Sequence, residues 1–418
     1  MTYNIAVIGG GAAGMAAAIK ASMSGAGVTL YEREGKLGRK LGITGKGRCN
    51  VTNDCTPEEF MASVVRNPKF LYSAAFRYPP SSIKEFFEKL SVPLKTERGG
   101  RVFPVSDKAS DIVNALRREM KRLGVEVKTD FRVREIAASD DGTFSVSDGR
   151  ATARHTAVII CTGGVSYPLT GSTGDGYGFA ERFGITVSDR YPSLVPIETA
   201  EDTEELAGLT LKNVRLSAML GNKTVFSEFG EMLFTHFGVS GPLVLSASAV
   251  MGGRDASEYR LEIDLKAAVS EEDLDERLSE LFREGAAKDF VNATAHLLPV
   301  KLVKRVAAIA KIPERIKTGD VTREMRREYI KALKHFPLTP VCYRPIDEAI
   351  VTRGGINIKE IDPRTMEAKR VGGLYFAGEV IDVDAYTGGY NLQIAFSSGF
   401  LAGEAAAERF FEMKDILR

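Results

Sequence analysis

The sequence predicts an α/β fold in which a Rossmann-like domain is interrupted by an antiparallel domain and by a small helical insert. Three observations predict this fold. A buried strand followed by glycines at GxGxxG spacing opens the chain, the pattern becomes alternating and strand-like near Tyr191-Pro192, and residues 270–335 are charge-rich with helical periodicity. At 418 residues, the chain is long enough for two or three domains.

The first βαβ unit carries a dinucleotide-binding pattern. Residues 5–8 (IAVI) read as a buried parallel strand, and Gly9, Gly11 and Gly14 follow at GxGxxG spacing. These glycines allow a tight turn, close backbone approach to a pyrophosphate, and close packing of the next helix. A second strand delivers Glu32 eighteen residues after Gly14, where an acidic side chain accepts hydrogen bonds from ribose hydroxyls. The pattern leaves open whether the dinucleotide is FAD or a nicotinamide.

The rest of the chain alternates between helical and strand-like segments. The spacing predicts an amphipathic helix over 107–124, a β-meander over 131–150 and buried strands at 157–164 and 371–384. Between 191 and 266 the alternation predicts an antiparallel domain. Ser270-Glu271-Glu272-Asp273 is a candidate capping box that opens the helical insert.

Three further segments are rich in glycine and suited to ligand loops. They are GKLGRKLGITGKGRCN at 35–50, TGGVSYPLTGSTGDG at 162–176 and GGLYFAGEVIDVDAYTGG at 372–389. The last leads into a helix-like run beginning NLQIAF, whose N-terminus presents N–H groups and a positive dipole end. The cations of the first segment, including Lys40 and Arg48, either neutralise an anionic ligand or are simply solvated.

Composition limits the partners that we expect. With 56 basic and 55 acidic residues the net charge is +1, so we expect no nucleic acid partner, and a tRNA-modifying flavoprotein is disfavoured. No apolar run reaches the ~18 residues of a membrane span, and the N-terminus runs straight into a strand, which predicts a cytoplasmic protein. Four scattered cysteines and four histidines predict neither a dithiol centre nor a metal site.

Motifs distributed over the whole chain resemble the HI0933-like flavoproteins, also called the BaiN family, of the two-dinucleotide-binding superfamily. They are GGGAAG at 9–14, GITGKGRCN at 42–50, RVFPVSDKASDIV at 101–113, GEMLFTHFGVSGPLVL at 230–245 and GLYFAGEVIDVDAYTGGYNLQIAFSSG at 373–399. The resemblance implies an FAD-binding domain at 1–190 and 355–418, a β-barrel-like domain at 191–267 and 336–354, and a helical insert domain at 268–335.

The resemblance also implies which residues contact FAD. Near the flavin pyrimidine edge the backbone is expected to do most of the holding, so alanine substitutions at 391–393 are expected to be mild. The expected FAD contacts are Gly9, Gly11, Ala13, Gly14, Glu32, Arg33, Lys40, Gly45, Arg48, Cys49, Asn50, Thr162, Gly163, Gly164, Gly378, Glu379, Gly389, Asn391, Leu392 and Gln393.

Four side chains are candidates for chemistry beside a flavin, which itself carries the electrons. Tyr386 flanks the predicted flavin edge and carries a hydroxyl suited to proton donation, as does Tyr390. His236 lies in a family-like motif and titrates near neutral pH, although a structural role is more common for a lone histidine. Cys49 lies in a glycine loop and is either near the flavin or a packed small residue.

The favoured function is reduction of a carbon–carbon double bond conjugated to a carbonyl in a small molecule. The resemblance motivates it through the reduction of unsaturated 3-oxo bile acids, with NAD(P)H reducing the flavin. No second glycine fingerprint follows Gly14, so NAD(P)H is expected to bind transiently. The alternatives are an amine oxidase that uses oxygen, because an aminoacetone oxidase belongs to the family, and a flavin-binding sensor without turnover.

Overall fold

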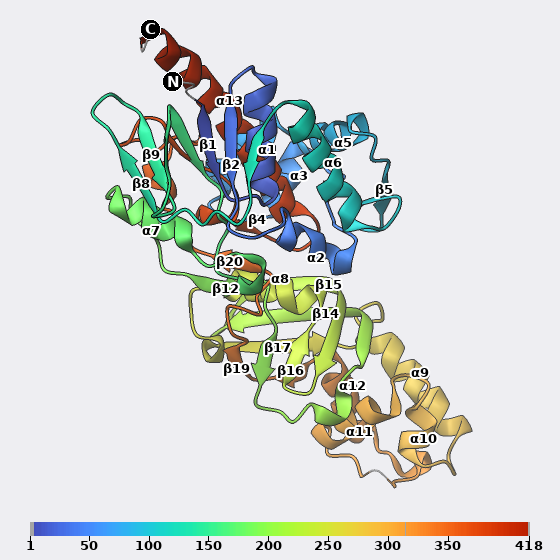
Figure 1. Ribbon diagram of the computed structural model, residues 1–418. Helices are drawn as coiled ribbons and strands as arrows, with labels where there is room; N and C mark the ends of the chain where they lie inside the picture. Colours follow the sequence, from blue (N-terminus) through green and yellow to red (C-terminus); the bar gives the residue numbers. More distant parts are fainter. Residues whose placement is uncertain (1–3, 314, 417–418) are drawn as a thin grey trace. The chain divides into compact units, whose positions relative to one another are not determined.

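The computed structural model describes residues 4–313 and 315–416, and the chain divides into two compact units (Figure 1). The first unit contains Met1–Ser193 and Ile346–Arg418, and the second contains Leu194–Pro345. The second unit is therefore an insertion in the chain of the first. Among the described residues, no helix combines the length and the apolar character needed to cross a bilayer.

A five-stranded parallel sheet forms the centre of the first unit. Its order is β21-β11-β1-β2-β7, and all four neighbouring pairs are parallel. Every residue of β1, β2, β11 and β21 is buried, as expected for a parallel sheet covered on both faces. The predicted α/β fold is confirmed at this level. The strands are β1 (Ile5–Ile8), β2 (Val28–Tyr31), β7 (Glu126–Lys128), β11 (Ala157–Ile160) and β21 (Leu374–Phe376).

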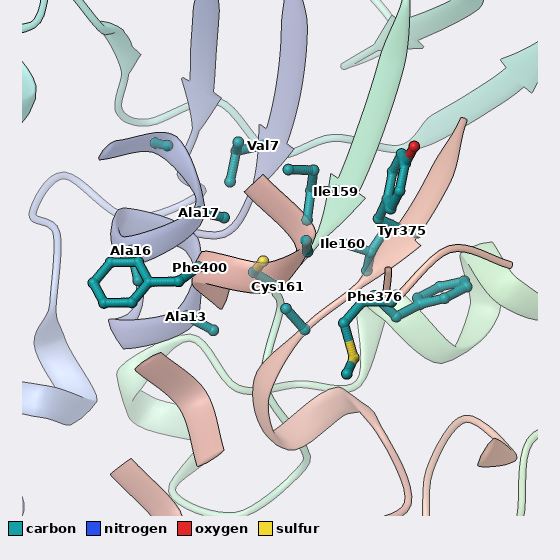
Figure 2. Close-up of a cluster of buried hydrophobic side chains, with 14 of the residues drawn as sticks. Val7, Ala13, Ala16, Ala17, Ile159, Ile160, Cys161, Tyr375, Phe376 and Phe400 are labelled. Atoms are coloured by element: carbon teal, nitrogen blue, oxygen red, sulfur yellow. The ribbon is translucent and has the colours of Figure 1, made fainter. Parts of the chain in front are cut away.

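Two helices from opposite ends of the chain pack closely over this sheet. They are α1 (Ala12–Met23) and the long α13 (Tyr390–Ile416). Figure 2 shows alanines of α1 and Phe400 of α13 beside the buried side chains of β1 and β11. A Cβ atom added at Gly399 would lie 2.5 Å from the carbonyl oxygen of Ala13, and one added at Gly403 would lie 2.3 Å from that of Ala17. Only glycine permits this backbone contact.

The first unit also contains shorter helices and several small sheets. The helix predicted at 107–124 is α6, and the predicted meander is the antiparallel sheet β10-β9-β8. The remaining helices are α2 (Arg39–Gly47), α3 (Pro57–Ala62), α4 (Tyr72–Arg77), α5 (Pro80–Lys89), α6 (Ala109–Arg122) and α7 (Asp175–Arg182). The small sheets are β3 (Thr52–Asn53), β6 (Arg101–Pro104) and β5 (Leu94–Glu97); β10 (Thr152–His155), β9 (Phe144–Ser147) and β8 (Glu135–Ala138); β12 (Tyr191–Ser193) and β20 (Val351–Arg353); β22 (Asp384–Ala385) and β4 (Val64–Arg66).

The second unit contains a seven-stranded sheet in which every neighbouring pair is antiparallel. Ser270 caps α9 by accepting a hydrogen bond from the Asp273 N–H, as the capping pattern predicts. In order, the strands are β18 (Phe336–Leu338), β17 (Tyr259–Asp264), β14 (Thr210–Leu220), β15 (Lys223–Thr235), β16 (Gly238–Ser240), β13 (Ile197–Thr199) and β19 (Pro340–Tyr343). The helices are α8 (Pro242–Met251), α9 (Glu271–Glu284), α10 (Phe290–Thr294), α11 (Val300–Ile309) and α12 (Arg323–Lys334).

The compact units differ from the predicted domain limits in two respects. Residues 191–193 and 346–354 belong to the first unit, because β12 and β20 pair with each other there. The helical segment 268–335 clusters with the antiparallel sheet, because α12 packs on β17 and β18 and Lys334 pairs with Asp264 at 2.6 Å. Closure of that sheet into a barrel and a separate helical domain stay predictions.

The close contact between α1 and α13 predicts that replacing a glycine by alanine destabilises the protein on α13 but not on the exposed face of α7. Gly403→Ala should destabilise the protein by about 1–3 kcal/mol, because the added methyl group meets the backbone of α1. Gly178→Ala on α7 is the matched control. Its added methyl group meets nothing within 4 Å, so it should stabilise by ~0.4–1 kcal/mol. Urea unfolding midpoints measure both effects, and equal midpoints for the two variants would contradict the packing argument.

Candidate functional site

The glycine turn after β1 leaves open space where a ligand would meet the start of α1. A Cβ atom at Gly9 (φ +103°) would lie 2.5 Å from the Cys161 carbonyl oxygen, and one at Gly14 would lie 1.8 Å from that of Gly9. A Cβ atom at Gly11 meets nothing within 4 Å. No side chain caps α1 at Gly11, so the N–H groups of its first turn lack intrahelical partners. The turn therefore fits a pyrophosphate.

Glu32 is held beside this turn, directly after β2. Its two carboxylate oxygens accept hydrogen bonds from the Gly10 N–H at 2.7 Å and from the Glu34 N–H at 2.8 Å. Burial raises the pKa of Glu32, and these two backbone donors oppose that rise. Each oxygen keeps a second lone pair, so the side chain retains acceptor capacity for a ribose hydroxyl.

An ion pair joins the three glycine-rich segments. Lys40 Nζ lies 2.8 Å from Glu379 Oε2 and donates to Ser166 Oγ at 2.7 Å. Glu379 Oε1 accepts from Ser166 Oγ at 3.0 Å and from the Thr352 N–H at 2.9 Å. The predicted residues Lys40 and Glu379, 339 positions apart, thus lie together. Ser166 and Thr352 were not among the predicted site residues, because Ser166 is one of several polar residues in its glycine-rich segment and no motif marks Thr352.

The loop that begins at Thr162 wraps closely around Thr352. Thr352 Oγ1 accepts hydrogen bonds from the Val165 N–H at 2.8 Å and the Ser166 N–H at 3.1 Å. A Cβ atom at Gly164 would lie 2.3 Å from Thr352 Oγ1, so only glycine fits there. Thr162 Oγ1 is buried and has no hydrogen-bond partner among the described residues. An orphaned buried hydroxyl beside a glycine loop is consistent with a ligand contact.

Two arginines that were predicted to contact FAD, Arg48 and Arg33, bind other side chains of the protein. Arg48 donates from Nε to Asp107 Oδ1 at 2.7 Å, pairs with Glu97, and lies 4.0 Å over the Phe103 ring. Arg33 donates to Thr173 Oγ1 at 2.5 Å. These contacts favour structural roles for both arginines, and their contact with a cofactor stays a prediction.

Cys49 is buried within the glycine loop. Its backbone is left-handed (φ +61°), its N–H donates to the Thr44 carbonyl at 2.9 Å, and burial raises the pKa of its thiol to about 12. Such a thiol is a weak acid at neutral pH, which favours the packing interpretation over proton donation. Next to it, Asn50 Oδ1 accepts from the Val102 N–H at 3.1 Å, and Gly45 is also left-handed (φ +57°).

The loop before α13 is held by side chains as well as by backbone. Asn391 Oδ1 accepts from the Ala385 N–H at 3.0 Å, and Nδ2 donates to the Ala385 carbonyl at 2.8 Å. Gln393 is fully buried; it accepts from Thr52 Oγ1 at 2.7 Å and donates to the Tyr78 carbonyl at 2.8 Å. These contacts argue against a mild effect of alanine at the two positions, because the amide groups span the loop, and the effect itself stays a prediction. Leu392 is half-buried.

The structure holds Tyr386 at this loop, whereas His236 belongs to the second unit. The Tyr386 N–H donates to the Ser63 carbonyl at 3.0 Å, and its own carbonyl accepts from Asn391 Nδ2 at 3.3 Å. His236 is exposed in the turn between β15 and β16 of the second unit, edge-on to Phe237. Proton donation by either residue stays a prediction.

The same loop contains a buried carboxyl group, that of Asp384, which was not among the predicted site residues. It is fully buried; Oδ2 accepts from Ser193 Oγ at 2.6 Å, and Oδ1 has no partner among the described residues. Burial raises its pKa, against the fields of Arg353 and Arg66. Arg66 itself donates from Nη2 to Asp382 Oδ2 at 2.8 Å. The sequence feature that could have indicated this group is the pair of aspartates, Asp382 and Asp384, in the segment VIDVDAY.

Comparison with known proteins identifies the family. A sequence model described as the HI0933-like protein Rossmann domain matches residues 3–405. The chain belongs to the HI0933-like family. A 3-dehydro-bile acid delta(4,6)-reductase of Clostridium scindens is 30% identical over 409 residues, covering 97% of this chain and 99% of the relative. A ribosomal RNA dihydrouridine synthase of Escherichia coli K12 is 32% identical over 406 residues, covering 96% and 97%.

A solved structure shows the same fold at low identity. The 3-ketosteroid-delta4-(5alpha)-dehydrogenase from Rhodococcus jostii RHA1 matches with a TM-score of 0.52 at 15% identity, covering 97% of this chain and 96% of that protein. The resemblance stated from the motifs is confirmed, and this HI0933-like chain is a flavin-dependent oxidoreductase. The family implies FAD, which the open space at Gly11 fits. Because a relative acts on ribosomal RNA, the net charge of +1 does not exclude a nucleic acid partner.

The open space at Gly11 predicts a variant that folds but binds FAD weakly. The added methyl group of Gly11→Ala meets no protein atom within 4 Å, so the unfolding midpoint of the FAD-free protein should stay the same. FAD affinity, measured by quenching of flavin fluorescence, should fall because the methyl group occupies ligand space. Gly14→Ala is the contrasting variant and should unfold more readily in the FAD-free protein. Unchanged FAD affinity in Gly11→Ala would place the pyrophosphate elsewhere.

The amide contacts before α13 predict a loss of stability. Gln393→Ala should destabilise the protein by about 1–3 kcal/mol, because it leaves the buried Thr52 hydroxyl and the half-buried Tyr78 carbonyl without their partner. Asn114→Ala, at an exposed position on α6, serves as the control and should change stability by less than about 0.5 kcal/mol. Chemical unfolding followed by circular dichroism measures both, and a neutral Gln393→Ala would contradict this account of the loop.

Proposed function

We propose that the protein reduces a carbon–carbon double bond conjugated to a carbonyl. The observation that carries this proposal is the shared chemistry of two relatives that match nearly the whole chain. A 3-dehydro bile acid with a Δ4 double bond contains an enone. The C5–C6 double bond of uridine, absent from dihydrouridine, is conjugated to the C4 carbonyl. Two different molecules thus present the same reactive group to related proteins.

FAD, when bound, supplies hydride transfer to the β-carbon of such a substrate after reduction by a nicotinamide. The role of the protein is to bind the cofactor and the substrate and to orient them toward each other. The turn at Gly9, Gly11 and Gly14 receives the pyrophosphate, and Glu32 accepts from the adenosine ribose. The Lys40–Glu379 pair fixes the glycine-rich segments to one another, so their backbones meet the cofactor in a preformed arrangement.

Reduction of the double bond also requires a proton at the α-carbon. Tyr386 is our candidate donor, because the loop that carries it is fixed at Ser63 and by Asn391. The thiol of Cys49 is buried, with a pKa of about 12, and is the weaker candidate. No second glycine fingerprint follows Gly14, so we infer transient nicotinamide binding.

An anaerobic titration of the purified FAD-bound protein tests the function. NADH and then NADPH are added while the flavin absorbance is followed, and 2-cyclohexenone is then admitted in the absence of oxygen. We expect bleaching by one nicotinamide and recovery of the absorbance with the ketone. Bleaching by a primary amine with recovery only in air would instead establish the amine oxidase. Absence of bleaching by either nicotinamide would remove the proposed electron source.

A proton donor is needed when the ketone reoxidises the flavin, but not when NAD(P)H reduces it, so the rates of these two half-reactions identify the donor. Tyr386→Phe should leave bleaching by NAD(P)H unchanged and slow recovery with the ketone about 10²-fold, because only the second half-reaction needs the proton. Tyr191→Phe, an exposed tyrosine on β12, is the control for loss of a hydroxyl. Stopped-flow absorbance separates the two steps. Equal slowing of both steps would assign Tyr386 to cofactor binding and not to proton transfer.

A further inference from the structure

Thr352 lies on β20, in the two-stranded ladder at which the chain leaves and re-enters the first unit. The second unit is inserted between β12 and β20, and Thr352 is the partner of Pro192 across this ladder. The side chain of Thr352 is fully buried. The residue lies outside the segments 1–190 and 355–418 that were predicted to bind FAD. Its hydrogen bonds nevertheless connect the ladder to two of the glycine-rich segments.

The hydroxyl group of Thr352 orders the start of the loop 162–176. Its Oγ1 atom accepts hydrogen bonds from the N–H groups of Val165, at 2.8 Å, and Ser166, at 3.1 Å. A Cβ atom at Gly164 would lie 2.6 Å from Thr352 Cβ, so the loop backbone lies directly against this side chain. The conformation of the loop therefore depends on one oxygen atom that accepts from two backbone donors.

The same loop reaches the turn that we place at the pyrophosphate. It begins directly after β11, and a Cβ atom at Gly9 would lie 2.5 Å from the Cys161 carbonyl oxygen and 3.2 Å from Thr162 Cα. The Thr352 N–H donates to Glu379 Oε1 at 2.9 Å. Thr352 thus contacts the segment 162–176 through its hydroxyl group and the segment 372–389 through its backbone.

The other strand of the ladder is also bonded to the segment 372–389. Ser193 on β12 is the partner of Val351, and its Oγ atom donates to Asp384 Oδ2 at 2.6 Å. Both Ser193 and Asp384 are fully buried. Each strand of the ladder therefore donates one hydrogen bond to a carboxyl group of the segment that leads into α13.

We propose that Thr352 is a positioning residue through which FAD binding is coupled to the β12–β20 ladder. Its hydroxyl group holds the loop 162–166 in the binding conformation in advance, so less conformational entropy is lost when FAD binds. Coupling between two sites is reciprocal, so FAD in turn restricts opening of the ladder. The inference goes beyond the proposed reaction, because it concerns cofactor binding whichever double bond is reduced.

Hydrogen exchange of the unaltered protein tests the coupling without any substitution. Amide exchange is measured by mass spectrometry, with and without FAD, in peptides that cover 162–170, 191–193 and 351–353. We expect FAD to slow exchange about fivefold or more in the loop and in both strands of the ladder. The β8–β9 hairpin of the same unit is the reference and should change less. A ladder that FAD leaves unchanged, or a hairpin that slows equally, would overturn the coupling.

Two variants that differ by one oxygen atom isolate the hydroxyl group. Thr352→Ser and Thr352→Ala both lose the methyl group, but only serine keeps the acceptor for Val165 and Ser166. Thr352→Ala should bind FAD about tenfold more weakly than Thr352→Ser, as measured by quenching of flavin fluorescence. It should also reduce the effect of FAD on exchange in the ladder. Equal FAD affinities of the two variants would contradict the role of the hydroxyl group.

A buried threonine of the second unit provides the matched control. Thr294 on α10 is fully buried, and its Oγ1 atom donates to the Phe290 carbonyl at 2.8 Å. Thr294→Ala should lower the unfolding midpoint but leave FAD affinity unchanged. A loss of affinity as large as that of Thr352→Ala would show that affinity only follows stability, and would overturn the assignment.

The two measurements remain decisive if a variant is unstable. Circular dichroism verifies that each variant folds, and exchange of the unaltered protein decides the coupling if Thr352→Ala does not fold. Neither measurement involves turnover, so failure of this inference is distinguishable from failure of the proposed reduction.

Discussion

The site depends on the direct backbone contacts among β1, α1, β11 and α13. The Cβ positions of Gly14 and Gly399 are filled by carbonyl oxygens, of Gly9 and of Ala13 respectively, so no side chain separates these elements. Close packing fixes the N-terminus of α1 against the end of β1 and leaves open space in front of Gly11. The N-terminus of α13 is positioned by the same contacts. Both helix ends are thus set by small residues deep in the unit, before any ligand is considered.

Much of this arrangement could be predicted, because it depends on patterns among residues that are close together in the sequence. Continuous apolar runs such as IAVI predict buried parallel strands, and the glycine spacing with Glu32 predicts the nucleotide turn, since each depends on neighbours in sequence. The parts that could not be predicted depend on long-range contacts. Lys40 and Glu379 were both identified, but their pairing was not, and Thr352 gave no signal at all.

Two expectations from the sequence overlooked local features of the structure. Alanine was expected to be mild at Asn391 and Gln393, because an amide at a helix start reads as a generic polar residue. The partners of these two amide groups, the Ala385 backbone for Asn391 and the Tyr78 carbonyl for Gln393, can be identified only from the fold. The net charge of +1 led us to expect no nucleic acid partner, but a net charge is a sum over the whole chain and does not give the charge of any one part of the surface. Arg98 and Arg101, for example, are both exposed at the turn between β5 and β6.

The ladder between β12 and β20 bears on how such a chain can be assembled. Ser193 and Val351 are direct partners across this ladder, so the polypeptide leaves the first unit and returns to it at neighbouring points. The whole of the second unit thus occupies the position of a hairpin loop. Inserting or exchanging a domain there leaves the register of the parallel sheet untouched, because the two ends of the insertion are already joined. A fold built in this way keeps its nucleotide-binding half constant while the inserted half is free to diverge.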